Sequence, residues 1–307
     1  MFRLPDAWVW DFWLADDGTN YHMFFLYASR ALGDPEARHF RASIGHAVST
    51  DLTNWHRTRD ALVRADPPAF DDLATWTGST VQHPDGTWFL FYTGATRTAL
   101  GVVQTIGYAT STDLLTWTKN PANPVLRADS RRYETLGTSD WDDEAFRDPW
   151  VFPDPQGDGW HMLITARDNT GPSDNRGVIG HATSPDLRTW QLQDPLSPPG
   201  QGFAQLEVIQ VEHVNGRPTL VFSCLPSETS ATRQATGIDS GVWIATAQSL
   251  LGPYDLENAV PITGSSLYSG RVIRNRHTGK WTLLAFQHDP NDPTFGQICG
   301  PQVFPTS

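Results

Sequence analysis

Three stretches of the chain repeat one pattern: "IGHAVSTDLTNW" (residues 44–55), "IGYATSTDLLTW" (106–117) and "IGHATSPDLRTW" (179–190). A weaker fourth copy, "VWIATAQSLLGPY", covers residues 242–254. In the three clear copies, alternating residues predict a β-strand, the Ser-x-Asp-Leu segment predicts a tight turn, and the tryptophan begins a further strand. The four copies start 62, 73 and 63 residues apart, so the chain contains a repeating unit of about 60 to 70 residues.

A run of β-branched and aromatic residues precedes the repeated pattern and occurs five times. The runs are "YHMFFLYAS" (21–29), "TWFLFYTGA" (87–95), "WHMLITARD" (160–168), "PTLVFSCLP" (218–226) and "KWTLLAFQH" (280–288). Turn residues come before these runs, and one more strand-like segment comes before each turn. Four antiparallel strands in each of five units predict an all-β fold, a five-bladed β-propeller with four-stranded antiparallel blades, formed by residues 1–307 as a single domain.

Two other β architectures are weaker alternatives. A β-sandwich does not explain five copies of the same internal strand order, and the repeats of a β-helix are much shorter than these. The composition, with 25 Gly and 23 Pro, indicates many turns and favours a turn-rich β fold over a helical one.

Charge and cysteine content exclude several kinds of partner. The net charge is −12, and no basic patch is visible that would bind nucleic acid or an anionic membrane surface. Neither Cys224 nor Cys299 lies in a metal-binding spacing, and no apolar signal segment is visible at the N-terminus, which predicts a cytoplasmic protein. The ten histidines form no recognised ligand pair, so we expect no metal and no cofactor. A neutral small molecule is the expected partner, and the oligomeric state stays open.

In a propeller the innermost strand of each blade borders the central channel. These strands are predicted to be "AWVWDFWLA" (7–15), "TWTGSTVQH" (75–83), "AFRDPWVFP" (145–153), "AQLEVIQVE" (204–212) and "LYSGRVIRN" (267–275). Comparable positions in the five strands are held by Asp11, Ser79, Arg147 with Asp148, Glu207, and Tyr268 with Arg271. We therefore expect polar side chains from distant parts of the sequence to meet in one pocket.

Three acids on these strands, Asp11, Asp148 and Glu207, indicate the chemistry of glycoside hydrolysis. One carboxyl group attacks the sugar or activates water, and another donates a proton to the leaving oxygen. A single acid in such a place is more often a structural group bonded to backbone N–H groups, but three at equivalent blade positions favour catalysis. Arg147 can keep a neighbouring carboxylate charged and can donate to sugar hydroxyls.

The motifs "VWDFW", "WTGST", "FRDPWVF" and "QLEVIQV" resemble those of glycoside hydrolase clan J, families 32 and 68, which contain invertase-type and levansucrase-type enzymes. The fold of these families is a five-bladed propeller, in agreement with the repeat count. The resemblance implies that Asp11 is the nucleophile that attacks the anomeric carbon of a fructosyl unit and that Glu207 is the acid/base. It also implies that Asp148 binds two fructose hydroxyls and stabilises the transition state.

The resemblance assigns substrate-binding roles to further residues. Trp10 and Trp76 would wall the fructose subsite, and Ser79 would hydrogen-bond near the nucleophile. Arg147 would hold the furanose and the acid, and Tyr268 would lie on the acceptor side.

Some features depart from the family pattern. Gln205, which we also expect to bind substrate, stands where levansucrases carry a second acidic residue. We expect neither the long levansucrase insertions nor the C-terminal β-sandwich of invertase-type enzymes in residues 1–307. We expect a retaining β-fructofuranosidase that mainly hydrolyses sucrose or short fructooligosaccharides, with some fructosyl transfer. Two alternatives stay open: an inverting α-L-arabinofuranosidase or β-xylosidase of the related five-bladed group, and a non-catalytic sugar-binding propeller.

An acidic run, "SDWDDEAFRD" (139–148), precedes and includes the Arg-Asp motif. It contains Asp140, Asp142, Asp143 and Glu144. Clustered carboxylates can bind calcium, but this spacing matches no EF-hand loop, so we interpret the run as a solvated acidic loop.

Overall fold

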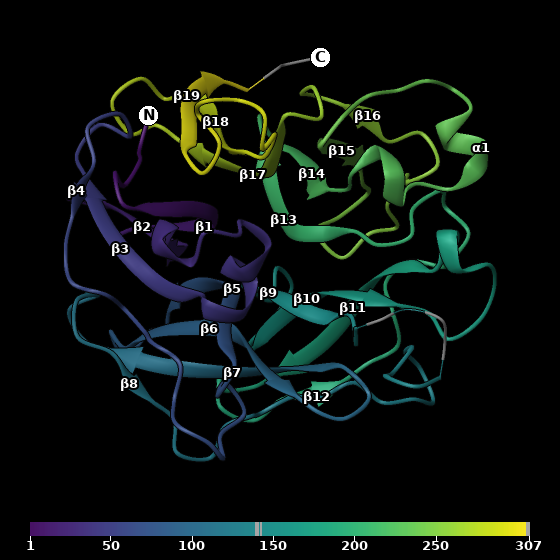
Figure 1. Ribbon diagram of the computed structural model, residues 1–307, viewed down its shortest axis with the longest axis horizontal. Coiled ribbons are helices and arrows are strands. Elements are labelled where there is room, and N and C mark those ends of the chain that lie inside the picture. Colours follow the sequence, from purple (N-terminus) through teal and green to yellow (C-terminus); the bar gives the residue numbers. More distant parts are fainter. Residues whose placement is uncertain (139–140, 142, 305–307) are drawn as a thin grey trace.

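The computed structural model describes residues 1–138, 141 and 143–304, and its strands form five sheets around a central axis (Figure 1). Neighbouring strands within the sheets are antiparallel. The strands that begin the sheets, β1, β5, β9, β13 and β17, lie next to one another around the channel. The predicted all-β, five-bladed propeller is therefore confirmed.

The bounds of the strands follow the repeat. Blade 1 comprises β1 (Ala7–Asp16), β2 (Tyr21–Ser29), β3 (Ser43–Ser49) and β4 (His56–Arg57). Blade 2 comprises β5 (Ala74–Gln82), β6 (Trp88–Arg97), β7 (Val102–Ser111) and β8 (Thr118–Lys119). Blade 3 comprises β9 (Phe146–Pro153), β10 (Trp160–Arg167), β11 (Gly177–Ser184) and β12 (Gln191–Leu192). Blade 4 comprises β13 (Glu207–Val214), β14 (Arg217–Ser223), β15 (Val242–Thr246) and β16 (Val260–Pro261). Blade 5 comprises β17 (Leu267–Arg274), β18 (Trp281–Gln287) and β19 (Ile298–Val303).

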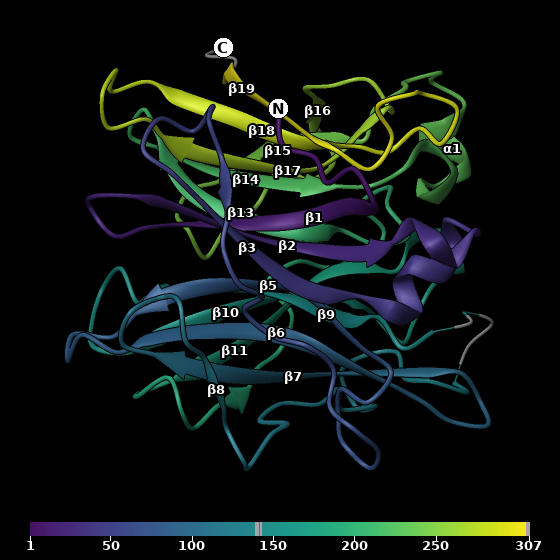
Figure 2. The ribbon, with the colours of Figure 1, turned by 60° about the vertical axis from the view of Figure 1, so that its left-hand side comes forward.

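Helical segments are short and lie in the loops. They are the 3₁₀ turns η1 (Arg30–Leu32), η2 (Glu36–Arg41), η3 (Ser173–Asn175) and η4 (Pro226–Glu228) and the helix α1 (Ala231–Gln234). Figure 2 shows the coiled segment after β2 at one end of the strands, opposite the hairpin that joins β1 to β2. In the described part of the chain, no helix has the length and apolar character needed to cross a membrane.

The fifth blade corrects one detail of the prediction. Its sheet has three strands within the described residues rather than four. The outer edge of β19 is instead paired by Phe2, whose backbone N–H donates to the Ile298 carbonyl at 2.8 Å and whose carbonyl accepts from Ile298 N–H at 2.9 Å. The first residues thus lie beside the last blade (Figure 1), and this pairing joins the two ends of the ring. One backbone bridge leaves no repeated sequence pattern, so the repeat could not predict it.

The Ser-x-Asp-Leu segment forms the same turn in each clear copy. In blade 1, the Asp51 carboxylate accepts the backbone N–H groups of Thr53 and Asn54 at 2.8 and 2.7 Å. Leu52 has a φ of 64°, in the left-handed region, and its carbonyl accepts the indole N–H of Trp55 at 3.0 Å. An Asp side chain that bonds the backbone ahead of it is a stable way to reverse the chain.

The tryptophan that ends the pattern packs one blade against the preceding one. Trp117 of blade 2 lies edge-on to Phe24 of blade 1, with ring centroids 5.6 Å apart. Trp190 of blade 3 meets Phe91 of blade 2 in the same way at 5.3 Å. Large aromatic rings bury much apolar area in such contacts, so the repeat specifies both the turn and the packing between blades.

Two buried histidine pairs recur at matching places in blades 1 and 3. His22 and His46 are joined through ring nitrogens 2.9 Å apart, and so are His161 and His181. Each pair needs one protonated and one bare nitrogen in that bond. Burial, together with a smaller effect of the partner histidine, lowers the pKa of His46 to about 3 and that of His181 to about 4.

We therefore predict that the fold loses stability as the pH falls below 6.5. The histidines of the unfolded chain bind protons near their ordinary pKa of 6.5, whereas His46 and His181 bind them only at much lower pH in the fold. Between pH 6.5 and about pH 5, each should remove about 2 kcal/mol from the free energy of unfolding. Urea unfolding at several pH values measures this slope. It should flatten in the double variant His46→Gln/His181→Gln but not in the exposed control His56→Gln, and an equal slope in all three proteins would contradict the prediction.

Candidate active site

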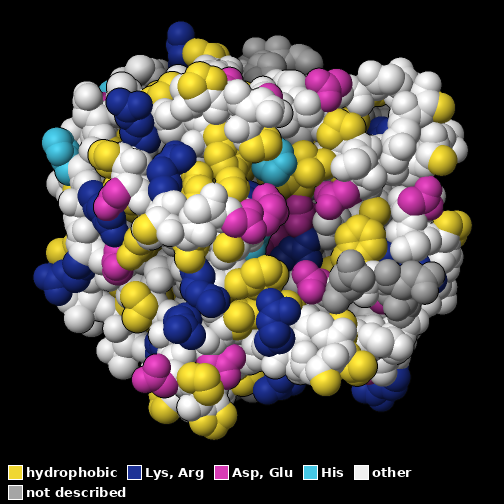
Figure 3. Space-filling model, in the orientation of Figure 1, with side chains coloured by type: hydrophobic (Ala, Val, Ile, Leu, Met, Phe, Trp, Pro, Cys, Tyr) yellow, Lys and Arg dark blue, Asp and Glu magenta, His cyan; other side chains and the backbone are white. Residues whose placement is uncertain are grey.

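A cavity of about 530 Å³ opens at one mouth of the channel. Figure 3 shows Asp and Glu side chains gathered around a hollow at the centre of this face, and the charged lining residues include Glu36, Asp143 and Glu228. Eight of the nine predicted site residues line it. They are Trp10, Asp11, Trp76, Arg147, Asp148, Gln205, Glu207 and Tyr268.

A backbone irregularity at the same place in all five inner strands points these side chains into the cavity. The pairing register shifts around Asp11 in β1, Thr77 in β5, Asp148 in β9, Val208 in β13 and Ser269 in β17. The last three of these residues have φ values of 56°, 53° and 50°. A bulge re-aims side chains by adding a residue to one strand, so five distant segments present consecutive residues to one point.

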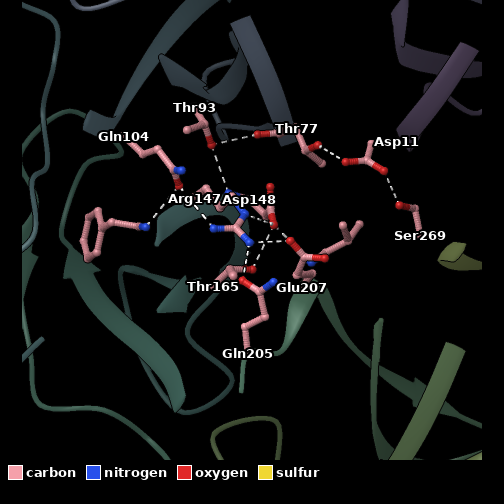
Figure 4. Close-up of polar contacts among 12 residues, drawn as sticks. Asp11, Thr77, Thr93, Gln104, Arg147, Asp148, Thr165, Gln205, Glu207 and Ser269 are labelled. Atoms are coloured by element: carbon pink, nitrogen blue, oxygen red, sulfur yellow. Dashed lines mark hydrogen bonds and ion pairs between the residues drawn. The ribbon is translucent and has the colours of Figure 1, made fainter. Parts of the chain in front are cut away.

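Asp11 receives two hydroxyl donors from neighbouring blades. Thr77 donates to its Oδ2 at 2.8 Å, and the Ser269 hydroxyl donates to its Oδ1 (Figure 4). Burial raises the pKa of Asp11, and the negative charge of Glu207 raises it further, whereas the two hydroxyl donors act in the opposite direction. Two donors hold both oxygens in place and stabilise the ionised carboxylate.

Glu207 is held by two donors of a different kind. The Arg147 guanidinium donates through Nη2 to Glu207 Oε1 and to Gln205 Oε1, and the Tyr268 hydroxyl donates to Glu207 Oε2. Burial and the charge of Glu207 raise the pKa of Tyr268 well above its ordinary value, so this phenol stays a donor. Arg147 and Tyr268 therefore fix the orientation of Glu207, and Gln205 holds Arg147 in place.

Asp148 lies deepest of the three acids. It is 3% exposed, its Oδ2 accepts the Thr165 hydroxyl at 2.9 Å and the Val208 N–H at 3.2 Å, and Arg147 Nε lies 3.7 Å from it. Burial raises the pKa of Asp148 to about 6, with Arg147 opposing the shift and the charges of Glu207 and Asp11 adding to it. Asp148 thus becomes ionised close to neutral pH.

Aromatic residues form part of the wall. Trp10 and Trp76 line the cavity, and the indole N–H of Trp76 donates to the His39 carbonyl at 2.7 Å. This bond ties the wall to η2, which also brings His39 itself to the rim. Because the indole N–H of Trp76 is bonded to the backbone, the apolar face of the ring is left to contact the C–H side of a sugar ring.

Ser79 is a correction to the predicted site. It is not among the described residues that line the cavity, it is 1% exposed, and its hydroxyl accepts the backbone N–H of Val151 at 3.0 Å. The bulge at Thr77 shifts the alternation of β5, so that Thr77 is the residue that contacts Asp11.

Other functional residues were not predicted from the sequence. Thr77 and Ser269 carried a usable signal, because each follows the residue that corresponds to Trp10, just as Asp11 does. Gln104 accepts from Arg147 at 3.3 Å, and His288 and Glu228 reach the cavity from loops. Burial raises the pKa of Glu228 to about 7, and the charge of Glu207 adds to this.

Only part of the acidic run before Arg147 lies within the described residues. Asp140 and Asp142 lie outside the described residues, whereas Asp143 lines the cavity and Glu144 accepts the Leu136 N–H at 3.2 Å. In residues 1–138, 141 and 143–304, no group of three or more His, Cys, Asp or Glu side chains is placed to hold a metal ion.

Three carboxylates that line one cavity in the mouth of a five-bladed propeller are the kind of acidic set that glycoside hydrolysis uses. Residues 14–256 match the model of the glycosyl hydrolases family 32 N-terminal domain, and the chain belongs to this family. Asp11 and the β17 residues lie outside the matched range.

Relatives of known activity match part of the chain. It is 35% identical over 191 residues to the vacuolar acid beta-fructofuranosidase 1 of a Rosa hybrid cultivar, which covers 60% of this chain and 28% of that protein. It is 32% identical over 208 residues to the sucrose:sucrose 1-fructosyltransferase of Festuca arundinacea, which covers 65% of this chain and 28% of that protein. The chain thus matches less than a third of the length of these relatives.

Solved structures share the fold. The inulosucrase from Halalkalicoccus jeotgali bound to kestose superposes with a TM-score of 0.74 at 23% identity, covering 94% of this chain and 77% of that one. The family 32 beta-fructofuranosidase of Bombyx mori gives a TM-score of 0.70 at 18% identity, covering 96% and 60%. These likenesses support the propeller architecture.

Proposed function

We propose that the protein is a retaining β-fructofuranosidase that hydrolyses sucrose or short fructooligosaccharides and transfers some fructosyl units to sugar acceptors. The observation that carries this proposal is that two acids in one cavity have different hydrogen-bond donors. Asp11 accepts neutral hydroxyl donors, whereas Glu207 is held by Arg147 and Tyr268. Family membership and the fructose-active relatives support the substrate class.

The proposed reaction has two steps. Asp11 attacks the anomeric carbon, the glycosidic bond breaks, and Glu207 gives its proton to the departing oxygen. In the second step Glu207 takes a proton from water, which attacks the fructosyl–Asp11 ester and releases fructose. Asp148 binds hydroxyls of the fructosyl ring and offsets the positive charge that develops on it.

Time-resolved proton NMR with sucrose, 1-kestose and an aryl arabinofuranoside tests this proposal. We expect glucose and fructose from sucrose, with the β anomer of fructofuranose appearing first. Cleavage of the arabinoside with sucrose untouched would replace the proposal with the related inverting group. Saturable binding without turnover of any substrate would identify a non-catalytic sugar-binding propeller.

We also propose that residues 1–307 act as one catalytic domain in the cytoplasm with a small sugar as its partner. Cys224 and Cys299 are both unpaired, which suits a reducing compartment. The acidic rim of the cavity suits a neutral sugar better than a polyanion.

A further inference from the structure

Arg271 of β17 is a buried cation in the channel with an unusual set of partners. It is 1% exposed, and its hydrogen bonds among the described residues go to backbone carbonyls. Nε donates to Phe12 at 3.0 Å, and Nη1 donates to Val208 at 3.0 Å and to Ile209 at 2.9 Å. Within the described chain Nη2 has no acceptor, and the guanidinium lies over the Trp150 ring at 5.1 Å. A buried charge without a bonded carboxylate is expensive and needs an explanation.

These partners lie one or two residues after the three acids in the sequence. Phe12 comes after Asp11, Val208 comes after Glu207, and Trp150 lies two residues after Asp148. One guanidinium therefore contacts the segments of β1, β13 and β9 that present the whole acidic set.

Val208 links Arg271 to Asp148 directly. Its carbonyl accepts from Arg271 Nη1, and its N–H donates to Asp148 Oδ2 at 3.2 Å. Its φ of 53° lies in the left-handed region, which a β-branched residue rarely adopts. The bonds on both sides of this residue hold the strained backbone in place.

The charge of Arg271 also acts on the acids. It lowers the pKa of Asp11, against the larger effect of burial. Burial in turn lowers the pKa of Arg271 to about 10, and the charges of Asp148 and Asp11 oppose this shift. Favourable interaction with both carboxylates is a reason for the protein to keep an otherwise costly cation.

Other charged groups face Arg271 from the opposite mouth of the channel. There it lines a second cavity of about 230 Å³ together with Asp16 of β1, Glu212 of β13 and Arg274 of β17. Asp16 has its own ion pair with Arg276 at 3.2 Å, and Arg274 is exposed. Asp11 and Asp148 are thus the buried carboxylates on which the charge of Arg271 acts most directly.

We propose that Arg271 is a positioning residue for the active site: it fixes the backbone beside Asp11 and Glu207 and places a buried positive charge close to Asp11 and Asp148. The catalytic part of this inference rests on the proposed function. Arg271 touches no substrate in this role and acts only through the acids.

The test compares Arg271→Met, which removes the charge, with Arg271→Lys, which keeps it. The readout is the pH profile of kcat/KM on sucrose. In Arg271→Met the acidic limb should move to higher pH by about one unit, so that the loss of activity at about pH 5 exceeds the loss at about pH 8 by roughly tenfold. Arg271→Lys should keep the limb in place while kcat falls, because the carbonyl contacts are lost. The exposed Arg274→Met is the matched control and should leave profile and rate unchanged.

A purely structural role predicts a different result. A folded Arg271→Met protein whose activity falls equally at every pH would overturn the proposal. If Arg271→Met does not fold, Arg271→Lys alone tests the proposal. Because lysine keeps the positive charge, the acidic limb of its kcat/KM profile should stay in place, and a move of about one unit would overturn the proposal.

A substrate-free measurement separates this inference from the proposed function. Carbon-13 NMR of labelled aspartate carboxyls follows the titration of Asp11 and Asp148 without turnover. If the wild-type protein leaves sucrose intact but both carboxyls titrate at higher pH in Arg271→Met, the proposed function fails and the role of Arg271 stands. If the wild-type protein cleaves sucrose but both carboxyls titrate at the same pH in Arg271→Met as in the wild type, the proposed function stands and the role of Arg271 fails.

Discussion

Asp11→Asn is expected to reduce kcat/KM for sucrose by a factor on the order of 10⁴ or more, because an amide cannot form the fructosyl ester. The substitution keeps the size of the side chain: one of the Thr77 and Ser269 hydroxyls can still donate to the amide oxygen, and the other can accept from the amide NH2 group. The fold should therefore survive. Initial rates of glucose and fructose release by proton NMR, with thermal unfolding as the check on folding, measure the effect.

The matched control is Asp16→Asn on the same strand. Asp16 is exposed at the far end of β1, outside the active-site cavity, and pairs with Arg276, which does not line that cavity. This variant should hydrolyse sucrose at the wild-type rate. If Asp11→Asn kept a tenth of the wild-type rate or more, Asp11 would not be the nucleophile, and a mechanism through activated water would take its place.

The blade repeat was predictable because the same short segment performs two local tasks. Asp51 closes a turn through its own carboxylate, and the tryptophan that follows in each copy packs on the preceding blade. Such local determinants are visible as spacing in a sequence. The hydrogen bonds between Phe2 and Ile298 join residues at opposite ends of the chain through backbone atoms alone. No pattern of side chains in the sequence could therefore predict them.

The inner-strand acids were predictable because equivalent positions of equivalent blades face one channel. The error at Ser79 has a local cause: simple alternation along β5 takes no account of the bulge at Thr77, which changes the residue that faces Asp11. His288 and Glu228 were missed for another reason. They come from loops that differ from blade to blade, so the repeat carries no information about where those loops return to the cavity.

Arg271 shows a further limit of sequence analysis. Its place on an inner strand was predictable, but its partners are carbonyls of β1 and β13, and any residue could supply those. Only the fold shows that the carbonyls belong to residues next to Asp11 and Glu207.

Glu207→Gln is the second variant with a large expected effect, and that effect should depend on the leaving group. Without a proton donor, cleavage of sucrose must expel an alkoxide, so we expect a loss of about 10² to 10⁴ in kcat/KM. Fructosyl fluoride has a leaving group that needs no proton, and its first step should lose far less. Arg147 can still donate to the amide oxygen and the amide NH2 group can donate to the Tyr268 hydroxyl oxygen, so the side chain should stay in place.

The comparison of sucrose with fructosyl fluoride identifies the role of Glu207 more sharply than the size of the loss on either substrate. Glu212→Gln, on the same strand but at the opposite mouth, is the matched control and should affect neither substrate. Equal losses on sucrose and on fructosyl fluoride would show that Glu207 acts by binding or by charge rather than as an acid. A small anion such as azide should also restore turnover of fructosyl fluoride in Glu207→Gln, because it attacks the ester on Asp11 without needing a general base. That rescue would tie the two acids to successive steps of one mechanism, since it requires both an intact Asp11 ester and the loss of the base that normally activates water.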